Sequence, residues 1–121
     1  MKQSKIIEAY KVLMKLSSCS MSVRAAYSLH KLRRQLAPVW EFQVEEEEKL
    51  IARLSPSANE DGTLRFQTVE DAEEFRKAQK ELGENEQEID FTPVSLALLD
   101  GVNISVNDLD TLDGFINFEE G

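Results

Sequence analysis

Residues 29–54 read LHKLRRQLAPVWEFQVEEEEKLIARL, and this stretch decides the fold of the chain. Apolar side chains recur in it at alternating spacings of three and four residues. That spacing is typical of a helix that lays one apolar seam against other helices. The seam comprises Leu29, Leu32, Leu36 and Val39, and Gln43, Glu46 and Leu50 continue it. With Ser22 as its N-cap, the pattern predicts a helical segment over residues 22–54.

Pro38 lies inside this pattern. A proline in a helix cannot donate a backbone hydrogen bond, and its ring crowds the carbonyl four residues earlier. We therefore expect a kink or a break at Pro38, and the sequence leaves open whether residues 22–54 form one kinked helix or two. A helix of this length is longer than a chain of 121 residues can bury, so its distal part is expected to project and to pair with a partner.

Two shorter helices are predicted, one on each side of the long one. The first covers residues 4–17, with Ser4 as its N-cap. The other covers residues 68–83, with Thr68 as its N-cap and Gly83 as its stop signal. Both segments carry apolar side chains at helical spacing, so each is expected to pack one face against the rest of the chain.

The connection between the second and third helices is short and polar. Residues 55–62 are rich in turn-forming side chains, and the pair Asp61-Gly62 can close a small β-hairpin. So short a connection favours an antiparallel pair of helices. We therefore expect residues 68–83 to lie back along residues 45–54.

The last part of the chain, residues 88–121, has a different character. Apolar residues alternate with others around residues 93–99, which favours a β-strand there. The alternative is a helix capped by Thr92, with Pro93 at its first position. Further on, Ser105 is predicted to cap a short helix. The chain is expected to close as a strand or an extended apolar segment that comprises Phe115, Ile116 and Phe118.

These elements predict a mostly α fold. Residues 1–54 form helices one and two, residues 68–83 form helix three, and residues 88–121 form a small C-terminal α/β appendage. The whole is a helical hairpin or small bundle built on a long, kinked second helix. The 121 residues suit one domain, and a composition of 41% hydrophobic and 31% charged residues is that of a globular chain.

The net charge of −9 hides an uneven distribution. Residues 1–40 hold eight basic side chains and one acidic one, a net of +7. Residues 41–121 hold six basic and 22 acidic side chains, a net of −16. The chain is therefore dipolar along its sequence, and charge complementarity with a partner becomes the main functional hypothesis.

The candidate binding residues come first from the acidic part. Four consecutive glutamates lie in the long helix, and further acids begin the third helix. Such runs are ordinary solvated helix faces, or they are surfaces that present negative charge to a basic partner. Two aromatic residues beside Pro38 pack in the core or anchor a partner. The set is Glu45, Glu46, Glu47, Glu48, Asp71, Glu73, Glu74, Trp40 and Phe42.

A basic patch in the first part of the long helix gives the alternative. It comprises Arg24, Lys31, Arg33 and Arg34, which are the residue types that neutralise nucleic-acid phosphates. The net −16 of residues 41–121 opposes binding to nucleic acid, and the helix-turn-helix glycine is missing. Self-assembly of the basic third against the acidic remainder uses both parts of the chain. We therefore expect a protein partner and a homo-oligomer rather than a nucleic-acid complex.

No catalytic, cofactor or metal site is predicted. The single cysteine, Cys19, rules out an internal disulfide, and nothing in the spacing brings His30 to it as a base. The acids around Asp108 resemble a calcium loop, but leucine stands at its fifth position and the glycine comes one residue late. Without an export signal or an apolar run of membrane-spanning length, we expect a cytoplasmic protein that binds no membrane.

The order of these segments resembles that of small uncharacterised proteins encoded by phages and prophages of Gram-positive hosts. The resemblance covers most of the chain. It rests on VRAAYSL at 23–29, EEEE at 45–48, NEDG at 59–62, DAEEF at 71–75 and NISVNDL at 103–109. It implies a phage setting, with neither an activity nor site residues to carry over. In that setting, small acidic proteins without enzymatic motifs are often assembly factors or inhibitors of host systems.

The sequence thus predicts a non-enzymatic, protein-binding module that needs no cofactor. It would act in the host cytoplasm as an inhibitor of a host defence or nucleic-acid-binding protein, or as an assembly accessory. The alternative is a nucleic-acid-binding regulator that uses the basic N-terminal helices.

Overall fold

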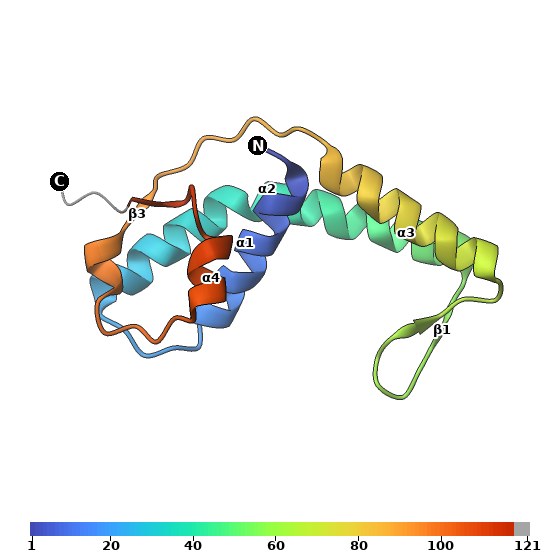
Figure 1. Cartoon of the computed structure of the whole chain (residues 1–121), viewed down its shortest axis with the longest axis horizontal. Coiled ribbons are helices and arrows are strands. Elements are labelled where there is room, and N and C mark those ends of the chain that lie inside the picture. The colour runs from blue at the N-terminus through green and yellow to red at the C-terminus, as the bar shows by residue number, and fades with distance from the viewer. Residues whose placement is uncertain (118–121) are drawn as a thin grey trace.

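The structure, a computed structural model, describes residues 1–117 and is mostly helical (Figure 1). Three longer helices form a body and a projecting arm, and short elements complete the body. In chain order the elements are α1 (Gln3–Leu16), α2 (Val23–Leu54), β1 (Ser57–Ala58), β2 (Leu64–Arg65), α3 (Val69–Glu84), β3 (Val94–Ser95), the 3₁₀-helix η1 (Leu96–Leu99), α4 (Val106–Thr111) and β4 (Ile116–Asn117). The prediction of a mostly α fold with a long second helix is confirmed.

The long helix α2 runs unbroken through Pro38 for 32 residues. Its direction changes near its middle, where it passes α1 (Figure 1). Its N-terminus is capped as the sequence predicts, because the Ser22 Oγ accepts a hydrogen bond from the Ala25 N–H at 3.2 Å. At its C-terminus Ser55 adopts a left-handed conformation with φ of 46°, and this residue turns the chain out of the helix.

The core lies where α1 crosses the first part of α2. The predicted seam of α2 is buried there, and α1 contributes a matching apolar face. Residues from the C-terminal region close the other side of the same core. Its fully enclosed side chains include Ile6, Leu13, Leu16, Leu32, Leu36, Leu112 and Phe115. Burial of each such side chain contributes about 1.5–3 kcal/mol, so this cluster fixes how α1 and α2 cross.

The distal part of α2 and α3 form the arm, which extends away from the body (Figure 1). The two helices are antiparallel, as predicted, and Thr68 caps α3 by accepting a hydrogen bond from the Asp71 N–H at 3.1 Å. Beyond α2 a small hairpin forms, in which β1 pairs antiparallel with β2 around the predicted Asp61-Gly62 turn. Outside the main core, Leu54 and Phe75 are buried in the arm, and Phe66 contacts Phe75 with ring centroids 5.1 Å apart.

The C-terminal region wraps back over the body. The strand β3 pairs in parallel with β4, and Val94 lies beside Ile116. The short helix α4 begins at its predicted cap, because the Ser105 Oγ accepts a hydrogen bond from the Asp108 N–H at 3.1 Å. Of the predicted closing segment, Phe115 and Ile116 are buried, whereas Phe118 lies outside the described residues.

Local predictions needed correction at three places. The strand predicted over residues 93–99 is only two residues long, and Leu96–Leu99 form a 3₁₀-helix that buries Leu99 in the core. Ser4 is not an N-cap, because α1 begins at Gln3, whose N–H donates instead to the Asn85 carbonyl at 2.8 Å. Gly83 does not end α3, which continues to Glu84.

Candidate protein-binding surface

One side of α2 faces away from the body and from α3 along most of its length. At 100° per residue, its exposed side chains fall within about a third of the helix circumference. We call this surface the outward face of α2. It comprises Val23, Arg24, Tyr27, Lys31, Arg34, Pro38, Glu41, Glu45, Glu48 and Lys49, all of which are exposed. The opposite side of the helix holds the buried seam, so the sequence pattern that buries one side also leaves this one to solvent.

The first part of this face is cationic. Arg24, Lys31 and Arg34 form no hydrogen bond or ion pair with any residue in 1–117, and α2 holds no acid before Glu41. Among these cations lies Tyr27, which is 67% exposed. An unpaired cation gives a partner's acid an attractive contact without a competing internal one.

The second part of the face is mostly anionic, and its one cation, Lys49, is paired with Glu46. Glu45 and Glu48, both predicted site residues, are exposed, and so is Glu41. Within residues 1–117 none of the three has a hydrogen bond or an ion pair. Glu41 is not among the predicted site residues, because it stands apart from the run of four glutamates. The signal that could have found it is its helical position, four residues before Glu45 on the same face.

The other two glutamates of the run are half-buried and have partners. Glu46 accepts a hydrogen bond from the Lys49 Nζ at 3.1 Å, and Glu47 accepts one from the Gln43 Nε2 at 2.7 Å. The Gln79 Nε2 of α3 also donates to Glu47 at 3.4 Å. Glu47 therefore joins α2 to α3 at the base of the arm, whereas the Glu46–Lys49 pair lies within α2. Of the run, only Glu45 and Glu48 are free to meet a partner.

The predicted acidic residues of α3 also differ in whether they have a partner. Glu74 pairs with Arg53 of α2, with 2.7 Å between Oε1 and Nη2, and this ion pair bridges the two helices of the arm. Asp71 is half-buried at the start of α3, whereas Glu73 is exposed. The acidic residues of α3 are interspersed with Arg76, Lys77 and Lys80, so the outer side of this helix carries charges of both signs.

The two aromatic candidates do not form one patch. Trp40 stacks on Tyr10 of α1, with ring centroids 4.8 Å apart, and packs against the main core. Trp40 is therefore half-buried against the core rather than part of an exposed aromatic patch. Phe42 is 39% exposed and lines a groove of about 310 Å³ between α2 and α3, together with Leu50 and Leu82.

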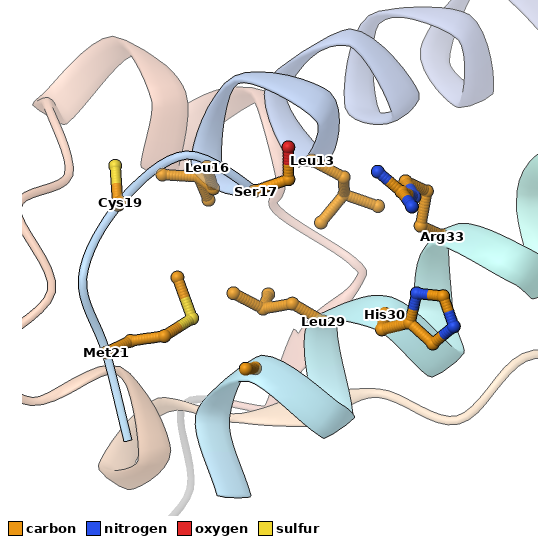
Figure 2. Close-up of a pocket in the computed structure, with 9 residues that line it drawn as sticks. Leu13, Leu16, Ser17, Cys19, Met21, Leu29, His30 and Arg33 are labelled. Atoms are coloured by element: carbon orange, nitrogen blue, oxygen red, sulfur yellow. The ribbon is translucent and has the colours of Figure 1, made fainter. Parts of the chain in front are cut away.

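Arg33, the remaining residue of the predicted basic patch, points in another direction. It is half-buried and lies with His30 at one side of a pocket of about 200 Å³ between α1 and α2 (Figure 2). Cys19 and Met21 lie on the other side of this pocket, and its floor is apolar. The predicted basic patch is therefore split between the pocket and the outward face of α2.

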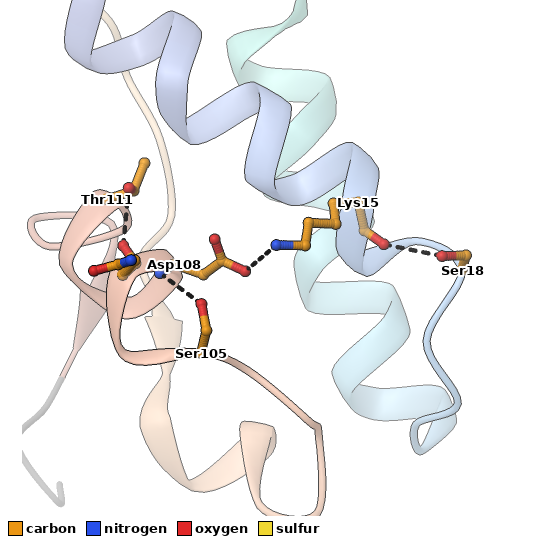
Figure 3. Close-up of polar contacts among 6 residues, drawn as sticks. Lys15, Ser18, Ser105, Asp108 and Thr111 are labelled. Carbon is orange, nitrogen blue, oxygen red and sulfur yellow. Dashed lines mark hydrogen bonds and ion pairs between the residues drawn. The ribbon is translucent and has the colours of Figure 1, made fainter.

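One of the acids that resemble a calcium loop, Asp108, has a structural role. Asp108 accepts a hydrogen bond from the Lys15 Nζ at 2.8 Å and so ties α4 to the end of α1 (Figure 3). That hydrogen bond holds the pKa of the Asp108 carboxyl below its usual value. Residues 1–117 contain no group of three acids, cysteines or histidines placed to hold a metal ion.

Two further findings concern the chain as a whole. None of the described helices is both long and apolar enough to span a bilayer. Comparison with protein-family models, with curated proteins and with solved structures finds no match to this chain. Its functional assignment therefore rests on the geometry and charge of its own surfaces.

Proposed function

We propose that this protein is a non-enzymatic protein-binding module whose binding surface is the outward face of α2. One observation carries this proposal. The exposed Arg24, Lys31, Arg34, Glu41, Glu45 and Glu48 of that face are unpaired within residues 1–117, whereas the other charged residues of the same helix beyond Pro38, Glu46, Glu47, Lys49 and Arg53, all have partners. Charges that are left unpaired along one continuous face are available to a partner.

The setting follows from the resemblance to small phage proteins. There the module would act in the cytoplasm of the host, either as an inhibitor that offers the anionic part of the face to a basic host protein or as an assembly accessory. The arm supports this reading, because it carries Glu45 and Glu48 on a helix that extends beyond the body (Figure 1). A projecting element can reach a partner without a clash between the two bodies.

The test neutralises the three free glutamates of the face. In the variant Glu41→Gln/Glu45→Gln/Glu48→Gln we expect at least a tenfold loss in the capture of basic host proteins, and a weaker salt dependence of what remains. The matched control, Glu88→Gln/Asp90→Asn/Asp100→Asn, removes the same charge from exposed positions outside α2 and should bind as the wild type does. Equal binding by both variants would overturn the proposal.

A second candidate function is nucleic-acid binding by the cationic part of the face. The observation that favours it is Tyr27, which lies exposed between Arg24 and Lys31 and offers the stacking group that such surfaces use. Fluorescence anisotropy with a labelled single strand at low salt tests it. No binding, or binding that Arg24→Gln/Lys31→Gln leaves unchanged, would remove this candidate.

A further inference from the structure

We propose that the outward face of α2 binds the same face of a second copy, in an antiparallel dimer whose two-fold axis passes beside Pro38. The inference rests on the proposed function in one respect, since it takes the same face as the binding surface. It goes further by naming the partner and the register of the contact. The inference rests on the distribution of charged residues on the two sides of Pro38.

The spacing of the charges makes the face self-complementary. Lys31 and Glu45 are each seven residues from Pro38, about 10 Å along the helix on opposite sides. Arg34 lies four residues before Pro38, and Glu41 lies three residues after it. When two copies cross antiparallel at Pro38, Lys31 therefore faces the partner's Glu45, and Arg34 faces the partner's Glu41.

The two-fold axis forms every contact twice. In an isologous interface each contact between a residue of one copy and a residue of the other is repeated with the two copies exchanged. The Lys31–Glu45 and Arg34–Glu41 contacts therefore give four ion pairs. A parallel arrangement of the same faces would instead place Lys31 against Lys31 and Glu45 against Glu45. Repulsion between like charges rules out that orientation and selects the antiparallel one.

The centre of the face permits a close approach. Pro38 is exposed there and carries no long side chain, so it leaves room for another helix to cross. Farther from the centre, Tyr27 and Val23 are 67% and 85% exposed, and they provide apolar surface beside the charges. These residues fit a partner that presents acidic residues to the cationic part of the face and basic residues to the anionic part. A second copy in the antiparallel orientation presents its charges in that order.

The oligomeric state tests the inference. We expect sedimentation equilibrium at low salt to give twice the monomer mass of 13.8 kDa. At about 0.5 M salt, where the Debye length falls to a few Å, the dimer should dissociate. The single variants Lys31→Glu and Glu45→Lys each set like charges against each other at two pairs, so each should raise the dissociation constant at least about tenfold.

The decisive variant combines both changes. Lys31→Glu/Glu45→Lys restores opposite charges at the same pairs and should return the dissociation constant to within about threefold of the wild type. Lys31→Glu/Glu48→Lys has the same net charge in the wrong register and should stay weak. A control, Glu88→Lys, changes the charge of an exposed residue outside α2 as Glu45→Lys does and should leave the dimer intact.

Specific results would overturn the inference. They are a wild-type monomer at low salt and high protein concentration, or equal rescue by the two double variants. These failures are distinguishable from a failure of the proposed function. A strictly monomeric protein that still loses its basic partner on neutralisation of Glu41, Glu45 and Glu48 would refute only the dimer. A register-specific dimer that captures no basic protein would refute only the host partner.

Discussion

Gln3 and Gln43 are 40 residues apart in the chain, and their side chains share a buried hydrogen bond of 2.6 Å between Nε2 and Oε1. Gln3 is fully buried, and Gln43 is 7% exposed. The bond belongs to a chain of three glutamine amides that ends on a carboxylate, because the Gln43 Nε2 donates onward to Glu47 and the Gln87 Nε2 donates to the Gln3 Oε1 at 2.9 Å. This network joins α1, α2 and the segment after α3 at the base of the arm.

We predict that Gln43→Leu destabilises the protein even though it completes the apolar seam of α2. The change leaves the Gln3 amide buried without its acceptor, which costs about 1–3 kcal/mol. Urea denaturation measures the free energy of unfolding. The double variant Gln3→Leu/Gln43→Leu removes both partners and should recover part of the loss. A single variant as stable as the wild type would show that the amide pair has no such role.

Gly83 allows α1 and α3 to approach closely, and we predict that a large side chain there separates them. A Cβ at this position would lie 3.1 Å from the Ser4 Cβ. We therefore expect Gly83→Leu to lower the free energy of unfolding by about 1–3 kcal/mol, as overpacking does. The exposed neighbour Glu84 provides the control, because Glu84→Leu meets no such contact. Thermal melting of both variants measures the difference, and equal melting temperatures would contradict the prediction.

The arm is expected to open more readily than the body, because it holds few buried side chains. Phe75 is the one buried residue of α3, whereas Leu36 lies fully buried in the main core. We predict that Phe75→Ala removes hydrogen-exchange protection from α3 and leaves α1 protected. By contrast, Leu36→Ala should cost about 2–5 kcal/mol and lower protection throughout. Loss of protection in α1 on Phe75→Ala would mean that arm and body unfold as one unit.

The Lys15–Asp108 pair gives a small contribution to stability that depends on pH. The pKa of Asp108 is lowered in the folded state, chiefly by the hydrogen bond from Lys15, so the pair stabilises above the ordinary aspartate pKa of about 4. That contribution is lost as the pH falls through the lower folded pKa. We predict that Asp108→Asn reduces the loss of melting temperature between neutral and acid pH by a small amount, because exposed pairs contribute about 0–1 kcal/mol. Asp110→Asn, an exposed change in the same helix, should not alter that loss.

The sequence by itself determined the three longer helices and the N-caps of α2, α3 and α4. The periodicity of apolar residues located α2 and its buried side. Ser22, Thr68 and Ser105 indicated where helices begin, because their hydroxyls can accept hydrogen bonds from the unpaired N–H groups of a first turn. These features depend on residues within a few positions of one another, and such residues can be read from the chain directly.

Only the tertiary structure decided which charges are free and where polar groups are buried. The run of four glutamates looks uniform, yet Glu47 is engaged by Gln79 of α3, 32 residues away in the chain. Gly83 reads as a helix stop, but it serves a close contact with Ser4, 79 residues away in the chain. Contacts of this kind depend on how α1, α2 and α3 cross. That crossing is set by packing between distant side chains, which local patterns do not encode.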